Sequence, residues 1–274
     1  MNAPKGFVDL VFSAENQQNY IGMGNPNARI LIIGREPAHD IQNKDDEKQL
    51  LAEKNYKRDQ TLNKSNWRNL IEEKPLTGVL WDGHIEVCNP RRPFPNQKCL
   101  RAYGNNDGTA TTWLWYQKLV DLILGREYDR PYSLRPLDFH DFCFHTDISA
   151  AAKNLATTDK GAKTTSVEER SRELFSHPFF KQFPIVILGI GTDVGKYVPL
   201  EWCDKVLGFP CEEVEKAFNA DEKQPMLWVN RDSKGRRILV HTQSLSQSSW
   251  EYLTKIRDII WADGKSDLCW PKAY

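Results

Sequence analysis

Two short apolar stretches of the sequence each end in side chains that can handle charge. The stretch RILIIG (29–34) runs into a turn that carries Glu36, and the stretch RRILVHT (236–242) ends with His241 followed by hydroxyl side chains. Taken alone, Glu36 could be a solvated turn residue or a helix cap, and His241 could be a hydrogen-bonded core histidine. A carboxylate at one strand end and a histidine at another are together typical of a site that handles charge.

Two further stretches bring polar residues to the same place in the predicted sheet. The aromatic, alternating stretch DFHDFCFHTDIS (138–149) offers His145 and Asp147, and PIVILGI (184–190) runs into the turn GIGTDVGK (189–196). In a parallel sheet the active site lies beyond the carboxyl ends of the strands. The joint occurrence of polar residues at several predicted strand ends therefore favours a functional site.

The turn GIGTDVGK does not match a phosphate-binding loop. Such a loop needs four residues between its first glycine and the Gly-Lys pair, which serine or threonine then follows. Here Gly189 leaves five residues, Gly191 leaves three, and Tyr197 follows Lys196. We therefore expect an ordinary turn from a strand to a helix.

Helical patterns separate the predicted strands, which is typical of a parallel sheet with helices on both faces. The sequence predicts a capping box that begins one helix at Ser166, and a long Pro-, Gly- and Asn-rich loop at 75–108. We expect one α/β domain over residues 1–274. The sequence predicts helices at 45–58, 109–124, 166–180 and 248–262 and a hairpin at 226–242.

The composition excludes some classes of protein. Lys and Arg together number 37, as do Asp and Glu, so a zero net charge argues against strong bulk attraction to nucleic acid but does not exclude a local basic patch. No apolar run is long enough to span a membrane, and the first residues lack the apolar core of a signal peptide, so we expect a cytoplasmic protein. The six cysteines are scattered with no CxxC pair, so we expect free, mostly buried thiols and neither a zinc ribbon nor a clustered iron–sulfur site.

These strand ends resemble the uracil-DNA glycosylase superfamily. The common uracil-excising branch carries GQDPYH after its first strand, where this chain has GREPAH at 34–39, and HPSPLS after its last strand, where this chain has HTQSLS at 241–246. Between them, FCFHTDIS places His145 where the family has a base-reading Asn. The lead-in GNPNARILIIG also resembles the family's entry to the first strand, so the resemblance spans most of the chain in order.

The resemblance implies base excision on a three-layer αβα sandwich with a short, mainly parallel central sheet. A glycosylase flips the target nucleotide out of the helix, and its sugar passes through an oxocarbenium-like state. Glu36 matches the family's Asp beneath C1′, and His241 matches the family's His, which donates to the departing base. The implied partner is DNA, with no cofactor and no obligatory metal.

Departures from the family motifs point to a modified base. Ala38 stands where the family's Tyr blocks substituents at the pyrimidine 5-position, and His145 replaces the Asn that reads uracil. Asp147 could accept a hydrogen bond from the exocyclic amine of a cytosine, and Gly34 and Arg35 complete the predicted base pocket. We expect a bulky 5-substituted cytosine such as glucosylated hydroxymethylcytosine, which phage-defence members of the superfamily remove. His145 or Asp147 could protonate such a leaving base.

The predicted DNA contacts come from local patches. The loop at 89–101 combines basic side chains with an aromatic ring, a nucleic-acid pattern, although a solvated loop explains it equally well. The hydroxyl side chains after the last strand match the family's loop that pinches DNA phosphates. Gln247, which follows them, could insert its side chain into the DNA helix. The residues are Arg91, Arg92 and Phe94 in the first patch and Thr242, Ser244, Ser246 and Gln247 in the second.

Other readings of the sequence stay open. The chain could be a uracil-excising repair glycosylase, or a non-catalytic module on the same fold that binds DNA or a modified base. An unrelated hydrolase or nucleotide-binding α/β enzyme is less favoured, because the sequence has no phosphate loop, no GxSxG elbow and no clustered metal ligands.

Overall fold

The computed structural model describes residues 3–35, 47–73, 79–81, 93–99, 111–128, 130–150, 160–191, 201–210, 215–216, 227–245 and 248–264. The helical elements are α1 (Lys5–Phe12), α2 (Glu47–Glu72), α3 (Thr111–Ile123), η1 (Tyr132–Leu134), α4 (Phe139–Phe142), α6 (Lys160–Arg170), the π-helical turn η2 (Ser171–Phe175), η3 (Pro178–Lys181), α7 (Trp202–Lys205) and α8 (Trp250–Ala262). The strands are β1 (Met23–Gly24), β2 (Ile30–Gly34), β3 (Cys143–Asp147), β4 (Ile185–Leu188), β5 (Glu215–Lys216), β6 (Trp228–Arg231) and β7 (Ile238–His241).

The strands of the described segments form one mixed sheet in the order β1-β3-β2-β4-β7-β6-β5. Its centre is parallel: β2 pairs with β3 on one side and β4 on the other, and β4 pairs with β7. The two edge strands, β1 and β5, and the strand β6 beside β5 run antiparallel to their neighbours. The predicted parallel strands and the predicted hairpin between β6 and β7 are confirmed.

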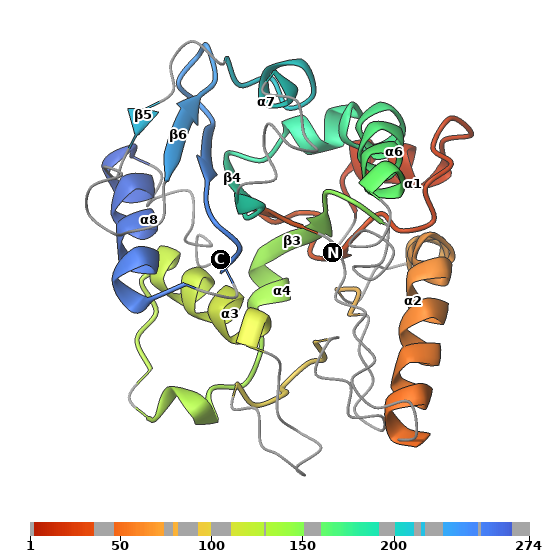
Figure 1. The fold of residues 1–274 in the computed structure, drawn as a ribbon, viewed down its shortest axis with the longest axis horizontal. Helices are drawn as coiled ribbons and strands as arrows, with labels where there is room; N and C mark the ends of the chain where they lie inside the picture. The colour runs from red at the N-terminus through yellow and green to blue at the C-terminus, as the bar shows by residue number, and fades with distance from the viewer. Residues whose placement is uncertain are drawn as a thin grey trace.

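Helices cover both faces of this sheet, which explains why its central strands are continuously apolar. Alternate side chains of β2 point to opposite faces: Leu31 and Ile33 join a core with α1, α2 and α6, while Ile30 and Ile32 join a core with α3 and α8. Figure 1 shows α3 and α8 together on one side of the sheet and α1, α2 and α6 on the other. The α/β class predicted from the sequence is therefore correct.

Three element boundaries differ from the sequence prediction. The helix α2 runs on to Glu72, well past the predicted end. The stretch 138–149 begins as the short helix α4, and only its second half is the strand β3. The capping-box prediction was wrong, because α6 begins at Lys160 and Ser166 lies inside it, where the Ser166 hydroxyl accepts a hydrogen bond from the Ala150 N–H (3.0 Å). The side chain found a tertiary partner in place of the local cap.

The last helix starts as the sequence predicts. Ser249 precedes α8, and its hydroxyl accepts the Tyr252 N–H at 3.2 Å, which satisfies one of the free donors of the first turn. The buried face of α8 carries Leu253, Ile256 and Ile260, which pack against α3. This packing covers the face of the sheet beside the strand ends described below.

The described part of the chain bears on the expected free cysteines and on the expected lack of a membrane-spanning segment. Cys99, Cys143 and Cys203 are free, as predicted. Among those same residues no helix has both the length and the apolar character that a membrane crossing requires.

Replacing Phe144 with Ala should destabilise the fold by about 3–5 kcal/mol, because the substitution leaves a cavity in the core. The Phe144 ring lies within 6.3 Å, centroid to centroid, of the rings of Phe7, Trp67, Phe179, Phe180 and Phe183. Urea denaturation measures the free energy of unfolding. The control is Leu62→Ala at a side chain that is 42% exposed, which should change it by less than about 0.5 kcal/mol. Equal losses in the two variants would contradict the packing argument.

Candidate active site

The order of the parallel strands puts a topological switch point between the carboxyl ends of β2 and β4. The chain leaves β2 for β3 on one side, and it leaves β4 for β7 on the other. The two connections therefore diverge, and ligands of open α/β sheets bind at such a switch point. Glu36 follows β2 by two residues, and Gly189 follows β4 directly.

Three polar side chains converge on Gly34 at the end of β2. Gly34 pairs in register with Asp147 on β3. A Cβ atom at Gly34 would lie 2.6 Å from Asp147 Oδ1, 3.1 Å from the Tyr116 hydroxyl and 3.2 Å from His145 Nε2. The pairing continues one residue further, because the Ser149 N–H donates to the Arg35 carbonyl at 3.1 Å. Glycine is required here because any larger side chain would occupy the point on which these groups converge.

His145 is buried without a hydrogen bond to its ring in the described part of the chain. Its side chain is 2% exposed, and neither ring nitrogen has a hydrogen-bond partner among the described residues. Asp147 Oδ1 lies 3.5 Å from His145 Nε2, and the rings of Trp113 and Tyr116 pack edge-on against the imidazole. A buried polar group without a partner costs about 1–3 kcal/mol, so this imidazole is a candidate for pairing with a ligand.

Tyr116 belongs to the site, although the sequence pattern assigns it to the apolar face of a helix. It lies on α3, and burial together with the Asp147 carboxylate raises the pKa of its phenol above the ordinary value. The hydroxyl therefore stays protonated and able to donate at neutral pH. No local motif distinguishes it from the core aromatic residues beside it, because its role comes only from the contact of α3 with the ends of β2 and β3.

Arg170 is a second residue that the sequence analysis missed. It is fully buried, and its guanidinium donates to the Asp147 carbonyl (3.0 Å), the Tyr20 carbonyl (2.7 Å) and the Thr146 hydroxyl (2.9 Å). Burial lowers its pKa to about 10, so it remains charged at neutral pH. Its spacing from Val167 and Leu174 puts an arginine on the apolar face of a helix, and this was the available signal. The guanidinium holds the end of β3 in place.

His241 ends β7 at the same edge of the sheet. Its Nε2–H donates to the Gly191 carbonyl at 3.1 Å, and its ring stacks on Trp228 with centroids 4.7 Å apart. Burial lowers its pKa to about 4, so the imidazole is neutral at pH 7. One strand, β4, separates it from β2, which corresponds to about 10 Å across the sheet. Gly191 takes the left-handed conformation (φ +61°) that this contact needs.

The structure locates only part of the predicted site. It brings Gly34, Arg35, His145 and Asp147 together at the ends of β2 and β3, and it places His241, Thr242 and Ser244 at the end of β7. The other predicted residues, Glu36, Ala38, Arg91, Arg92, Ser246 and Gln247, lie outside the described residues.

Two predicted DNA contacts need correction. Phe94 is 2% exposed, so its ring belongs to the interior and is not presented for stacking on a base. Thr242 is fully buried, and its hydroxyl donates to the Gln243 carbonyl at 2.8 Å, so it does not face a phosphate. Its backbone bridges β7 to the turn after β4, because its N–H donates to Leu188 and its carbonyl accepts from Gly191. Ser244 is partly exposed.

Comparison with known proteins adds no assignment. No protein-family model, no curated protein and no solved structure matches this chain. Among the residues that the structure describes, no group of three or more His, Cys, Asp or Glu side chains could hold a metal ion. The chemistry of this site must therefore be argued from its own side chains.

His241 should make the stability of the protein fall as the pH decreases from about 6.5 to 4. The folded protein has a pKa of about 4 for this imidazole, whereas an unfolded chain has about 6.5, so the unfolded chain binds the proton first. The free energy of unfolding therefore keeps its full value above pH 6.5. It falls by about 2 kcal/mol between pH 7 and pH 4.5, because the unfolded chain is stabilised by protonation. Urea denaturation of the wild type and His241→Phe at both pH values measures it. The variant keeps a ring against Trp228 and should lose less stability on acidification, and parallel losses would contradict the prediction.

Proposed function

We propose that this chain is a DNA glycosylase that removes a modified pyrimidine, with a bulky 5-substituted cytosine such as glucosylated hydroxymethylcytosine as its substrate. The observation that carries the proposal is the convergence of His145, Asp147 and Tyr116 on Gly34, two residues before Glu36. The neutral His241 at the same edge of the sheet supports it. Removing such bases would serve defence against phages whose DNA carries them, and the three-layer fold of the uracil-DNA glycosylases is part of this proposal.

The proposed reaction is hydrolysis of the bond between C1′ of the sugar and the base. The base departs with the electron pair of that bond, and the sugar becomes cationic as in other glycoside cleavage. The Glu36 carboxylate stabilises this cation and orients the water whose oxygen bonds to C1′. The proton released by the water balances the negative charge of the base. The neutral His241 imidazole has one N–H, and it stabilises that charge by turning its Nε2–H from the Gly191 carbonyl to the departing base.

The polar groups around Gly34 suit the hydrogen-bonding edge of cytosine. The Asp147 carboxylate accepts from the exocyclic amine, which cytosine has and uracil lacks. The Tyr116 hydroxyl, protonated at neutral pH, donates to a ring or carbonyl acceptor of the base, and His145 can act in either sense. Uracil would instead turn a carbonyl oxygen toward the carboxylate, which is repulsive. This contrast supports a cytosine-type base over uracil.

The base pocket has a rigid support that favours recognition. The Arg170 guanidinium binds the Asp147 carbonyl and the Thr146 hydroxyl, so the end of β3 cannot shift without breaking bonds to a buried charge. The rings of Trp113 and Tyr116, which also contact each other, pack edge-on against the His145 imidazole and hold it in place. Specific recognition needs polar groups that are held in position before the ligand arrives.

A non-catalytic module that binds a modified base is the second candidate. The observation that favours it is the bond from His241 Nε2 to the Gly191 carbonyl, which occupies the imidazole within the fold. Such a module would recognise the same base through Asp147 and Tyr116 without releasing it. Turnover distinguishes the two candidates.

Glu36→Gln should reduce base release by at least about 100-fold, because the amide cannot stabilise a cationic sugar. Mass spectrometry of the released base would be applied to DNA that contains uracil, cytosine, hydroxymethylcytosine or its glucosylated form. We expect the wild type to release the glucosylated base. The matched control is Glu72→Gln at the exposed end of α2, which should act like the wild type.

The outcomes of this experiment separate the candidates. Release of the bulky base by wild type and Glu72→Gln, but not by Glu36→Gln, supports the glycosylase. Release of uracil alone would keep the enzyme and overturn the assigned base. Binding of modified DNA without release of any base would support the binding module.

Asp147→Asn should change the base preference, because the amide can donate to the carbonyl that uracil presents at the position of the cytosine amine. Release of the cytosine-type base should fall at least about tenfold, and the ratio of uracil to cytosine-type release should rise. The ratio of kcat/KM values on the two substrates measures the effect. Asp141→Asn is the control. Asp141 is exposed and lies on α4, before the amino end of β3, whereas Asp147 lies at its carboxyl end. An unchanged ratio in Asp147→Asn would contradict this role.

A further inference from the structure

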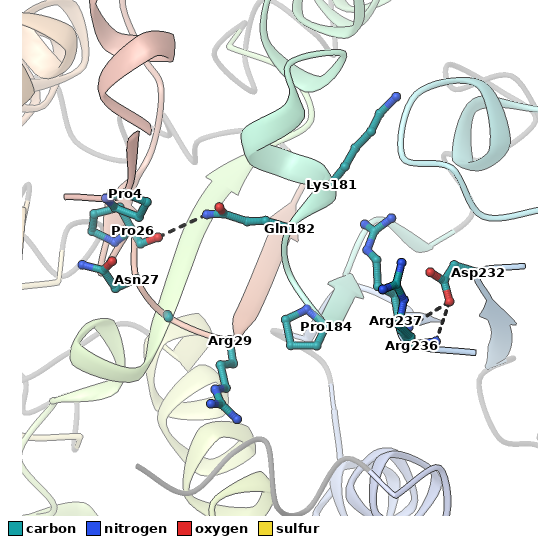
Figure 2. Close-up of a pocket in the computed structure, with 11 residues that line it drawn as sticks. Pro4, Pro26, Asn27, Arg29, Lys181, Gln182, Pro184, Asp232, Arg236 and Arg237 are labelled. Atoms are coloured by element: carbon teal, nitrogen blue, oxygen red, sulfur yellow. Dashed lines mark hydrogen bonds between the residues drawn. The ribbon is translucent and has the colours of Figure 1, made fainter. Parts of the chain in front are cut away.

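The amino ends of the parallel strands carry a basic cavity, at the opposite edge of the sheet from the candidate active site. Arg29 precedes β2, Pro184 precedes β4 and Arg237 precedes β7, and all three line a cavity of about 540 Å³. Figure 2 shows Arg29 on one flank of Pro184 and Arg236 and Arg237 on the other. We refer to this hollow as the amino-edge cavity. It draws on the turn RDSKGRR, which joins β6 to β7.

Arg237 gives the amino-edge cavity a fixed positive charge. Its guanidinium donates to the carbonyls of Phe183 (3.1 Å), Leu207 (2.8 Å) and Phe180 (3.4 Å) and stacks over the Phe209 ring at 4.4 Å. These partners are neutral, so they satisfy the N–H groups without balancing the charge. Burial lowers the pKa of Arg237, a cost that a bound anion would offset.

Three further cations surround the same cavity. Arg29, Lys181 and Arg236 are exposed, and no carboxylate of the described residues lies within ion-pair distance of them. The one acidic side chain in the lining is Asp232, and it accepts the backbone N–H groups of Arg236 (2.7 Å) and Arg237 (3.0 Å). The lining therefore holds four basic side chains and one carboxylate, and that carboxylate already accepts two backbone N–H groups of the turn. In a chain of zero net charge this is a concentrated positive site.

Neutral contacts hold the walls of the amino-edge cavity together. The Gln182 amide donates to the Pro26 carbonyl at 3.4 Å, which ties the segment before β4 to the segment before β2 (Figure 2). Pro4, which precedes α1, also lines the cavity, and α1 has no acidic residue in its first turn. The positive end of a helix dipole thus adds to the charge of the side chains.

We propose that the amino-edge cavity binds a small anion with two or more phosphate groups, such as a nucleoside diphosphate or triphosphate. Guanidinium groups bind phosphate oxygens through paired hydrogen bonds, and three of the four cations are arginines. The charges stand on opposite flanks of the cavity, so more than one anionic group is needed to meet them. The volume falls within the ~300–1,000 Å³ of small-molecule sites, and a compact ligand fits it better than an extended strand.

Isothermal titration calorimetry with inorganic triphosphate, thymidine triphosphate and a single-stranded thymidine octamer tests the proposal. The wild type should bind both triphosphates. The triple variant Arg29→Gln/Lys181→Gln/Arg236→Gln should weaken their binding at least about tenfold, because it removes three charged donors. Arg237 is left intact, since its bonds support the fold.

A matched control removes equal charge elsewhere on the surface. Lys57→Gln/Lys205→Gln/Lys234→Gln changes three exposed lysines outside the cavity lining, and one of them lies in the same hairpin turn. It should alter triphosphate affinity by less than about twofold, because none of these side chains lines the cavity and solvent screens their exposed charges. Absence of triphosphate binding, equal losses in the two triple variants, or binding of the octamer alone would each overturn the proposal.

Discussion

The parallel pairing of β2 with β3 on one side and β4 on the other is the constraint on which the rest of this structure depends. It sets Gly34 opposite Asp147 and brings the turn after β4 beside the end of β2. Both faces of β2 are buried. A shift of its register by one residue would move each β2 side chain to the opposite face of the sheet and disrupt both cores. Gly34 and Asp147 are therefore held by the same pairing that forms the centre of the fold.

Several polar groups are buried at the carboxyl ends of the parallel strands, and their burial costs free energy. The His145 ring has no hydrogen-bond partner in the described chain, the Arg170 charge is satisfied by neutral oxygens, and the His241 imidazole is held uncharged. One of these three groups is buried without a partner, and the other two keep theirs only within the fold, so their burial is costly. Their concentration around the topological switch point is the physical basis for the proposed binding and catalytic function, and the opposite edge carries positive charge that suits the proposed polyphosphate ligand.

The sequence predicted the central elements well because strongly apolar runs have few alternatives. The runs 29–34, 184–190 and 236–242 became β2, β4 and β7, and the amphipathic runs at 109–124 and 248–262 became α3 and α8. Prediction failed where a local signal competed with a distant partner. Ser166 looked like a helix cap but bonds Ala150, and Phe94 looked like an exposed stacking ring but lies in the interior. Such partners are remote in the chain and leave no periodic trace.

The sequence by itself determined the α/β class, the parallel strands and the chemistry at their ends, because hydrophobic periodicity and residue type are local properties. Only the tertiary structure decided which of those side chains meet. It brought Tyr116 and Arg170 to the candidate site through the packing of α3 and α6 against the strand ends. It also showed that Thr242, a predicted DNA contact, is buried and bonded within the fold. It also gathered Arg29 and Arg237, far apart in the chain, around one cavity. Proximity between distant segments is a product of folding, and no single stretch of sequence encodes it.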